Sequence, residues 1–99
     1  HRERWTSADD CDIMRIKADD SMGDVPDALT NAGTMVYNYD PSYRPDGNKI
    51  VYVKDDYNTG VTELRIMDPD GSNKATILDT HWPSTPRYSP DGTMIAFLD

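Results

Sequence analysis

The feature that most constrains the fold of this chain is a segment of thirteen residues that occurs twice. PSYRPDGNKIVYV at 41–53 matches PRYSPDGTMIAFL at 86–98, forty-five residues later, with six identities. A second pair, DIMRIKADD at 12–20 and TELRIMDPD at 62–70, recurs at a spacing of fifty. Periods of about 40–50 residues are typical of stacked supersecondary units. The chain is therefore predicted to consist of structural repeats.

Each repeat is predicted to be a set of β-strands joined by tight turns. The run after each Pro-Asp-Gly is short, apolar and rich in β-branched and aromatic residues, which favours a strand. Pro-Asp-Gly itself favours a turn, because Pro presets φ, Asp bonds its own backbone and Gly takes a positive φ. Four strands are expected in the complete repeat, at 40–44, 49–54, 61–68 and 74–78.

The strand at 49–54 carries four consecutive apolar residues, at 50–53. A strand of this kind has both of its faces buried, so its sheet needs a neighbour on each side. Four-stranded antiparallel sheets that repeat and pack face to face around an axis form a β-propeller. The expected fold class is therefore all-β, with β-propeller blades of four antiparallel strands.

Several motifs resemble those of one family. YRPDGNKIVYV and RYSPDGTMIAFL are similar to the Pro-Asp-Gly blade repeat of the TolB-type, WD-like β-propellers, in which an aromatic residue stands two positions before Pro-Asp-Gly. Tyr43 and Tyr88 hold that position here. ELRIMDPDG at 63–71 resembles the third strand of the family's blade, and ALTN at 28–31 resembles the end of its outer strand. The resemblance covers roughly residues 12–99.

The strands suffice for only about two blades, so the ring is expected to be incomplete. The expected parts are an N-terminal lead-in at 1–10, the last two strands of one blade at 11–31, a long connecting loop at 32–39, a complete four-stranded blade at 40–79 and the first two strands of the next blade at 80–99. Propellers close with about four to eight blades. We therefore expect other protein chains, further copies or a missing remainder to complete the propeller.

Composition excludes some partners. Ten Lys and Arg stand against eighteen Asp and Glu, and the net charge of -8 repels a phosphate backbone, so no nucleic acid is expected to bind. No apolar run approaches the length that spans a membrane. Mean hydropathy is -0.76, low for a chain that buries its own core, which favours a shared packing surface. Cys11 is the single cysteine and is expected to be a small half-buried thiol.

Three residues are candidates for a ligand site at the propeller channel. His81 lies in the link between an outer strand and the next inner strand, which in a propeller descends toward the channel. Arg44 and Arg87 flank the two Pro-Asp-Gly turns and are expected either to approach an anionic ligand in the channel or to bond turn carboxylates such as Asp46 and Asp91. A single histidine makes no metal site, so neither a metal nor a cofactor is expected.

Catalytic motifs are not found in the sequence. DPDGSN at 68–73 contains the residues of a calcium loop, but an EF-hand needs Gly at the sixth position, and counting from Asp68 places Gly71 fourth. A turn is therefore the better interpretation. No Gly-x-Ser-x-Gly elbow is present, and Cys11 has no neighbouring base in sequence, so no catalytic residue is expected.

Two functions remain open. The first is a non-catalytic propeller segment that acts as a protein-interaction or assembly scaffold. Its expected partner contacts are Met22, Met35, Val36, Tyr37 and Trp82. The second is the propeller portion of an extracytoplasmic enzyme, namely a peptidase, a polysaccharide lyase or a multisubunit redox enzyme, whose catalytic residues lie mostly outside this chain. The family resemblance implies a periplasmic or extracellular location.

Overall fold

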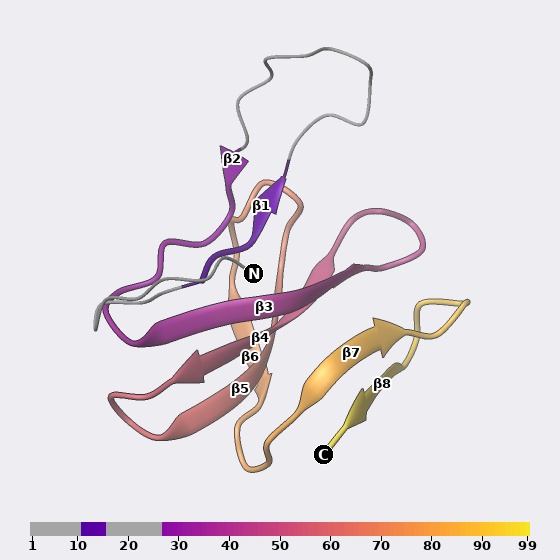
Figure 1. Ribbon diagram of the computed structural model, residues 1–99. Coiled ribbons are helices and arrows are strands. Elements are labelled where there is room, and N and C mark those ends of the chain that lie inside the picture. Colours follow the sequence, from indigo (N-terminus) through magenta and orange to yellow (C-terminus); the bar gives the residue numbers. More distant parts are fainter. Residues whose placement is uncertain (1–10, 16–26) are drawn as a thin grey trace.

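The computed structural model describes residues 11–15 and 27–99, and these residues form eight β-strands and no helix (Figure 1). The strands are β1 (Met14–Arg15), β2 (Asp27–Ala28), β3 (Val36–Tyr43), β4 (Ile50–Asp56), β5 (Val61–Met67), β6 (Ala75–Leu78), β7 (Ser84–Tyr88) and β8 (Ile95–Leu98). All strand pairs are antiparallel, which confirms the all-β prediction. Across the described ranges, no helix has the length and apolar character that crossing a bilayer requires. The expected lead-in at 1–10 and Met22 lie outside the described residues.

The central sheet contains β3, β4, β5 and β6 in chain order. These strands correspond to the four that were expected within one repeat, but β3 begins at Val36 and not at residue 40. Residues 36–39 therefore belong to a strand and not to the predicted connecting loop. The reason is that β4 continues to Asp56, which gives Val36 a backbone partner, while the ring of Tyr37 packs edge-on against Tyr57 at 5.2 Å.

Both Pro-Asp-Gly segments form the predicted tight turns. The N–H of Gly47 donates to the carbonyl of Arg44 at 2.7 Å, and the N–H of Gly92 donates to the carbonyl of Ser89 at 2.9 Å. The two glycines have φ values of 77° and 76°, which only glycine adopts without strain. The two turns thus have the same geometry forty-five residues apart.

The repeat extends to the irregular positions of the strands. The pairing of β3 with β4 shifts register around Asp40, and the pairing of β7 with β8 shifts register around Thr85. Both residues have positive φ, 55° for Asp40 and 45° for Thr85, as expected at a bulge. A spacing of forty-five residues separates them, so these two bulges occupy equivalent places.

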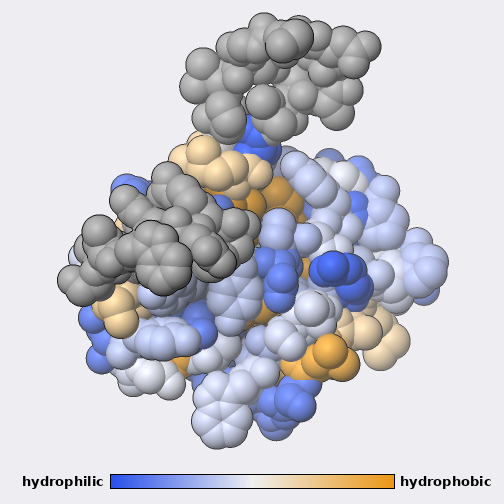
Figure 2. All heavy atoms as spheres, in the orientation of Figure 1, coloured by the Kyte–Doolittle hydropathy of each residue, from blue (hydrophilic) through white to orange (hydrophobic). Residues whose placement is uncertain are grey.

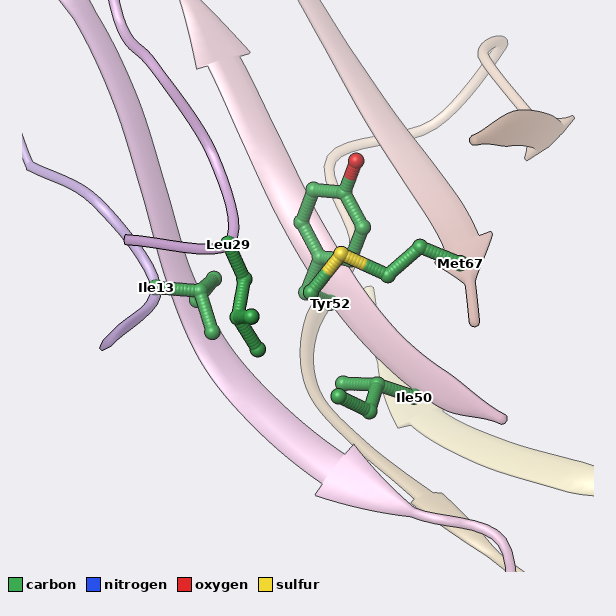
Figure 3. Close-up of a cluster of buried hydrophobic side chains, with 5 residues drawn as sticks. All are labelled: Ile13, Leu29, Ile50, Tyr52 and Met67. Carbon is green, nitrogen blue, oxygen red and sulfur yellow. The ribbon is translucent and has the colours of Figure 1, made fainter. Parts of the chain in front are cut away.

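The first face of the central sheet carries Ile50, Tyr52 and Met67. Figure 3 shows these side chains together with Ile13 and Leu29, which come from the segments beside β1 and β2. All five residues are at most 4% exposed. The small sheet β1–β2 is therefore held against the first face by apolar contacts.

The second face of the central sheet carries Val51, Val53 and Leu64. Tyr88 and Ile95, from the small sheet β7–β8, pack against this cluster. Residues 50–53 are at most 1% exposed, as their unbroken apolar run predicts. The central sheet is thus the middle of three layers, with β1–β2 on one side and β7–β8 on the other (Figure 1).

Cys11 is a free thiol and is only 8% exposed, so it is more deeply buried than expected. It forms an isolated parallel bridge with Tyr37, and its carbonyl accepts a 2.7 Å hydrogen bond from the N–H of Asn38. This contact attaches the first described segment to β3.

Candidate functional site

Arg44 bonds the carboxylate of its own turn. Its Nε donates to Oδ1 of Asp46 at 2.8 Å, and the same oxygen accepts the N–H of Asn48 at 2.9 Å. These two hydrogen bonds, that of Arg44 first, lower the pKa of Asp46. Of the two roles expected for Arg44, the structure shows the bond to a turn carboxylate.

A polar hollow of about 330 Å³ lies between the two Pro-Asp-Gly turns. It is lined by Arg44, Pro45 and Asp46 from the first turn and by Asp91 and Gly92 from the second. The hollow thus contains one cation, the guanidinium of Arg44, and two anions, the carboxylates of Asp46 and Asp91. The hollow is therefore negatively charged and suits an anionic ligand poorly.

Arg87 does not bond the carboxylate of the second turn. It is exposed, and its Nη1 donates to the carbonyl of the preceding residue at 2.7 Å. Asp91 instead accepts from the hydroxyl of Ser89 at 2.6 Å and from the N–H and hydroxyl of Thr93 at 3.1 and 2.8 Å. These bonds, that of Ser89 first, lower the pKa of Asp91 to about 2. Ser89 holds the position that Arg44 holds in the first repeat, which explains the difference.

His81 has a carboxylate partner that the sequence did not indicate. Its Nδ1 lies 2.5 Å from Oδ2 of Asp99, and Oδ1 of Asp99 accepts the N–H of Trp82 at 3.0 Å. The amide of Trp82 first, and then His81, lower the pKa of Asp99. Among the described residues, no group of three His, Cys, Asp or Glu side chains is arranged to hold a metal ion.

The turn at 68–73 is closed by its own hydrogen bonds, as the turn interpretation predicts. The N–H of Gly71 donates to the carbonyl of Asp68 at 2.9 Å. The carboxylate of Asp68 accepts from Nζ of Lys49 at 2.5 Å and from Nδ2 of Asn73 at 2.6 Å. These bonds, that of Lys49 first, lower the pKa of Asp68.

The expected partner contacts differ in exposure. Met35, Val36 and Tyr37 are half-buried at the start of β3, and the carbonyl of Met35 accepts the N–H of Tyr57 at 3.0 Å. Trp82, in contrast, is 76% exposed. Trp82 is therefore the most accessible of these four residues.

Sequence reasoning missed several exposed apolar residues, three of which lie in the C-terminal hairpin. Figure 2 shows a largely hydrophilic surface that is broken by separate hydrophobic patches. Among the exposed large hydrophobic residues are Tyr43, Met94, Phe97 and Leu98. The last two belong to β8, the counterpart of the buried run Ile50–Val53 of β4. The expectation that the last blade is incomplete is the signal that could have identified them.

Sequence reasoning also missed a cleft on the first face of the central sheet. The cleft has a volume of about 150 Å³ and lies between the segment that follows β2 and the strands β3, β4 and β5. It is lined by Thr30, Asn31, Ala32, Gly33, Val36, Asn38, Tyr52, Lys54, Arg65 and Lys74. Three of these ten residues are cations and none is acidic.

No protein-family model matches the chain, and no curated protein matches it.

Proposed function

We propose that this chain is a non-catalytic segment of a TolB-type β-propeller and acts as an assembly or protein-interaction scaffold. The observation that carries the proposal is a hydrogen bond of 3.1 Å from the N–H of Thr85 to Oδ2 of Asp40. These residues are equivalent positions of successive repeats. Direct contact between equivalent positions is expected when repeats are related by rotation about a shared axis, as blades are. By the same family resemblance, we propose a periplasmic or extracellular location.

The small sheet β7–β8 repeats one half of the central sheet. Tyr88 pairs with Ile95 in β7–β8, as Tyr43 pairs with Ile50 in β3–β4. The other two pairs of β7–β8 also have counterparts at the same spacing. This supports the assignment of β7–β8 as the first two strands of a further blade.

The small sheet β1–β2 repeats the other half. Arg15 pairs with Asp27 in β1–β2, and Arg65 pairs with Thr76 in β5–β6. The offsets are fifty residues for the first member of each pair and forty-nine for the second. This supports the assignment of β1–β2 as the last two strands of a preceding blade.

The two small sheets are therefore complementary halves of one blade. β4 pairs with β3 on one side and with β5 on the other, whereas its counterpart β8 belongs to a sheet of two strands. An open strand edge accepts another strand by backbone hydrogen bonding. The strand that suits β8 is of the β5 type, and β1 of a second copy is such a strand.

The register of this addition follows from the central sheet. Val53 pairs with Leu64, so we expect Leu98 of one copy to pair with Met14 of the next. Tyr52 pairs with Arg65 in the same two strands. We therefore expect Phe97 of one copy to pair with Arg15 of the next. Within a single copy the two small sheets cover opposite faces of the central sheet, so the pairing has to occur between copies.

The exposed aromatic residue of β3 supports the same arrangement. Tyr88 packs against the cluster of Val51, Val53 and Leu64 in the preceding unit. Its counterpart Tyr43 is 52% exposed, and Leu98, the counterpart of Val53, is 67% exposed. In the proposed assembly, Tyr43 of one copy covers Leu98 of the previous copy. Each copy then contributes two blades, and a ring of about four to eight blades contains about two to four copies.

Amide hydrogen exchange at 95–98 tests the proposal. We expect exchange to slow as the concentration of the full chain rises, because β8 gains a second partner strand. Leu98→Lys abolishes this dependence, since it places a charge at the joint. Ile77→Lys is the matched control on the outer strand β6, and it retains the wild-type behaviour. Exchange in the wild type that is independent of concentration would overturn the proposal.

A further inference from the structure

We propose that the cleft on the first face of the central sheet binds a small oxyanion, a carboxylate or a phosphate, through Arg65, Lys54 and Lys74. This site is separate from the channel residues expected from the sequence. It does not depend on the completion of the ring, because this chain alone supplies all of its lining residues.

The strand register brings the cations together. Asn38 is paired with Lys54, and Tyr52 is paired with Arg65, so each pair has its side chains on one face of the sheet. Tyr52 and Lys54 are two residues apart on β4 and therefore share that face. Lys74, which precedes β6, completes the cationic side of the cleft.

Arg65 supplies the observation that points to a ligand. Among the described residues, its Nε is a buried donor with no hydrogen-bond partner. Leaving such a donor unsatisfied is costly, and buried polar groups nearly always have partners. An oxyanion in the cleft satisfies it, because the guanidinium fork matches two oxygens of a carboxylate or a phosphate.

The charges around the cleft favour the same class of ligand. Within the part of the chain that the structure describes, Lys54 forms a long ion pair, with its Nζ 3.9 Å from Oε2 of Glu63. Glu63 also accepts a 2.6 Å hydrogen bond from the hydroxyl of Thr76. Lys74 donates to the carbonyl of Gly71, which is neutral. Besides Glu63, the carboxylate of Asp12 lies beside the cleft, where its Oδ1 accepts from the hydroxyl of Thr30, the N–H of Ala32 and Nδ2 of Asn38. The three cations that line the cleft outnumber these two carboxylates, so the balance of charge favours an anion.

The remaining properties of the cleft are consistent with a small anion. Tyr52 lines it, and burial raises the pKa of Tyr52, so its hydroxyl remains a neutral donor. The volume of about 150 Å³ equals that of several water molecules at about 30 Å³ each. A phosphate or a carboxylate group fits this space.

The experiment is a titration of the full chain with sodium phosphate, sodium acetate or sodium chloride at constant ionic strength. The Nε–Hε resonance of Arg65 is followed by NMR. We expect phosphate to shift this resonance in a saturable manner, acetate to do so more weakly because of its smaller charge, and chloride to have no effect. The order of the two affinities identifies a phosphate or a carboxylate as the preferred group, and no response to either would overturn the proposal.

Two matched variants locate the site. Arg65→Gln is expected to weaken phosphate binding about tenfold, because a charge-assisted hydrogen-bonding partner is lost. Arg87→Gln removes the same charge at an exposed position of β7 and leaves the affinity within about twofold. Equal losses in both variants would show non-specific screening and contradict the site.

Lys74→Gln keeps the proposal testable if Arg65→Gln fails to fold, since Lys74 is exposed at its position before β6. We expect this variant to weaken phosphate binding about fivefold. Wild-type affinity in Lys74→Gln, together with an unshifted Arg65 resonance, would also overturn the proposal.

Discussion

The backbone N–H of Thr85 donates a 3.1 Å hydrogen bond to Oδ2 of Asp40, and the two residues occupy the same place in strands that are forty-five residues apart. Both have positive φ. The bond therefore joins the bulge of β3 to the bulge of β7. It is a direct contact between equivalent points of successive repeats.

Substitution of Asp40 tests the contribution of this bond. Asp40→Ala is expected to lower the free energy of unfolding by about 1–2 kcal/mol, because it removes an acceptor and places a less tolerant residue at positive φ. Asp40→Asn is the control, since Asn retains an acceptor oxygen and adopts this φ readily. Urea unfolding monitors both variants. Equal midpoints for Asp40→Ala and the wild type would show that the bond contributes nothing.

The sequence predicts the parts of the fold that depend on local chemistry. The turn at 45–47 needs only Pro, Asp and Gly in order, and residues 50–53 show by their unbroken apolar character that two faces are covered. The start of β3 was missed because Val36 enters the strand through a partner, Asp56, that lies twenty residues away.

The sites could not be predicted in the same way. Lys54, Arg65 and Lys74 are separated by about ten residues each, and only the register of three strands places them around one cleft. The pairing of His81 with Asp99 likewise depends on how the C-terminal hairpin closes. Both features are long-range contacts, which carry no local signal.

The turn between β5 and β6 is predicted to reject any side chain at Gly71. This residue has φ of 88°, and an added Cβ would lie 2.6 Å from the carbonyl oxygen of Leu29. Gly71→Ala is expected to cost about 2–4 kcal/mol from conformation and backbone overlap. Gly47→Ala is the control: Gly47 has φ of 77° and open space around it, so the cost is about 1 kcal/mol. Equal losses in thermal unfolding would contradict the close approach.

Burial on the second face of β4 is tested by a side-chain deletion. Val51→Ala is expected to destabilise the protein by about 2 kcal/mol, because Val51 is fully buried against the second cluster. Val61→Ala makes the same deletion at a residue that is 37% exposed, and we expect less than about 0.5 kcal/mol. Chemical unfolding measures both values, and a similar loss at the two sites would disprove the layered packing.

The second Pro-Asp-Gly turn is predicted to weaken in acid. The pKa of Asp91 is lowered from 3.8 to about 2, first by the hydroxyl of Ser89. A lowered folded-state pKa stabilises the protein above pH 4, and this stabilisation is lost as the pH falls toward 2. Asp91→Asn is therefore expected to lose less stability than the wild type between pH 5 and pH 2.

Asp79→Asn, which removes a carboxylate from the segment after β6, is the matched control for this acid dependence. It is expected to follow the wild-type profile when the unfolding midpoint is recorded at each pH. Identical profiles for the wild type and Asp91→Asn would refute the role of the turn carboxylate.

The solution mass of the full chain, measured by multi-angle light scattering over a range of concentrations, tests most directly the proposal that further copies complete the two small sheets. One chain has a mass of 11.2 kDa. We predict a particle of about two to four times that mass, with the proportion of larger particles rising with salt as repulsion between acidic copies is screened. A folded particle of 11.2 kDa at every concentration and salt level would contradict the account.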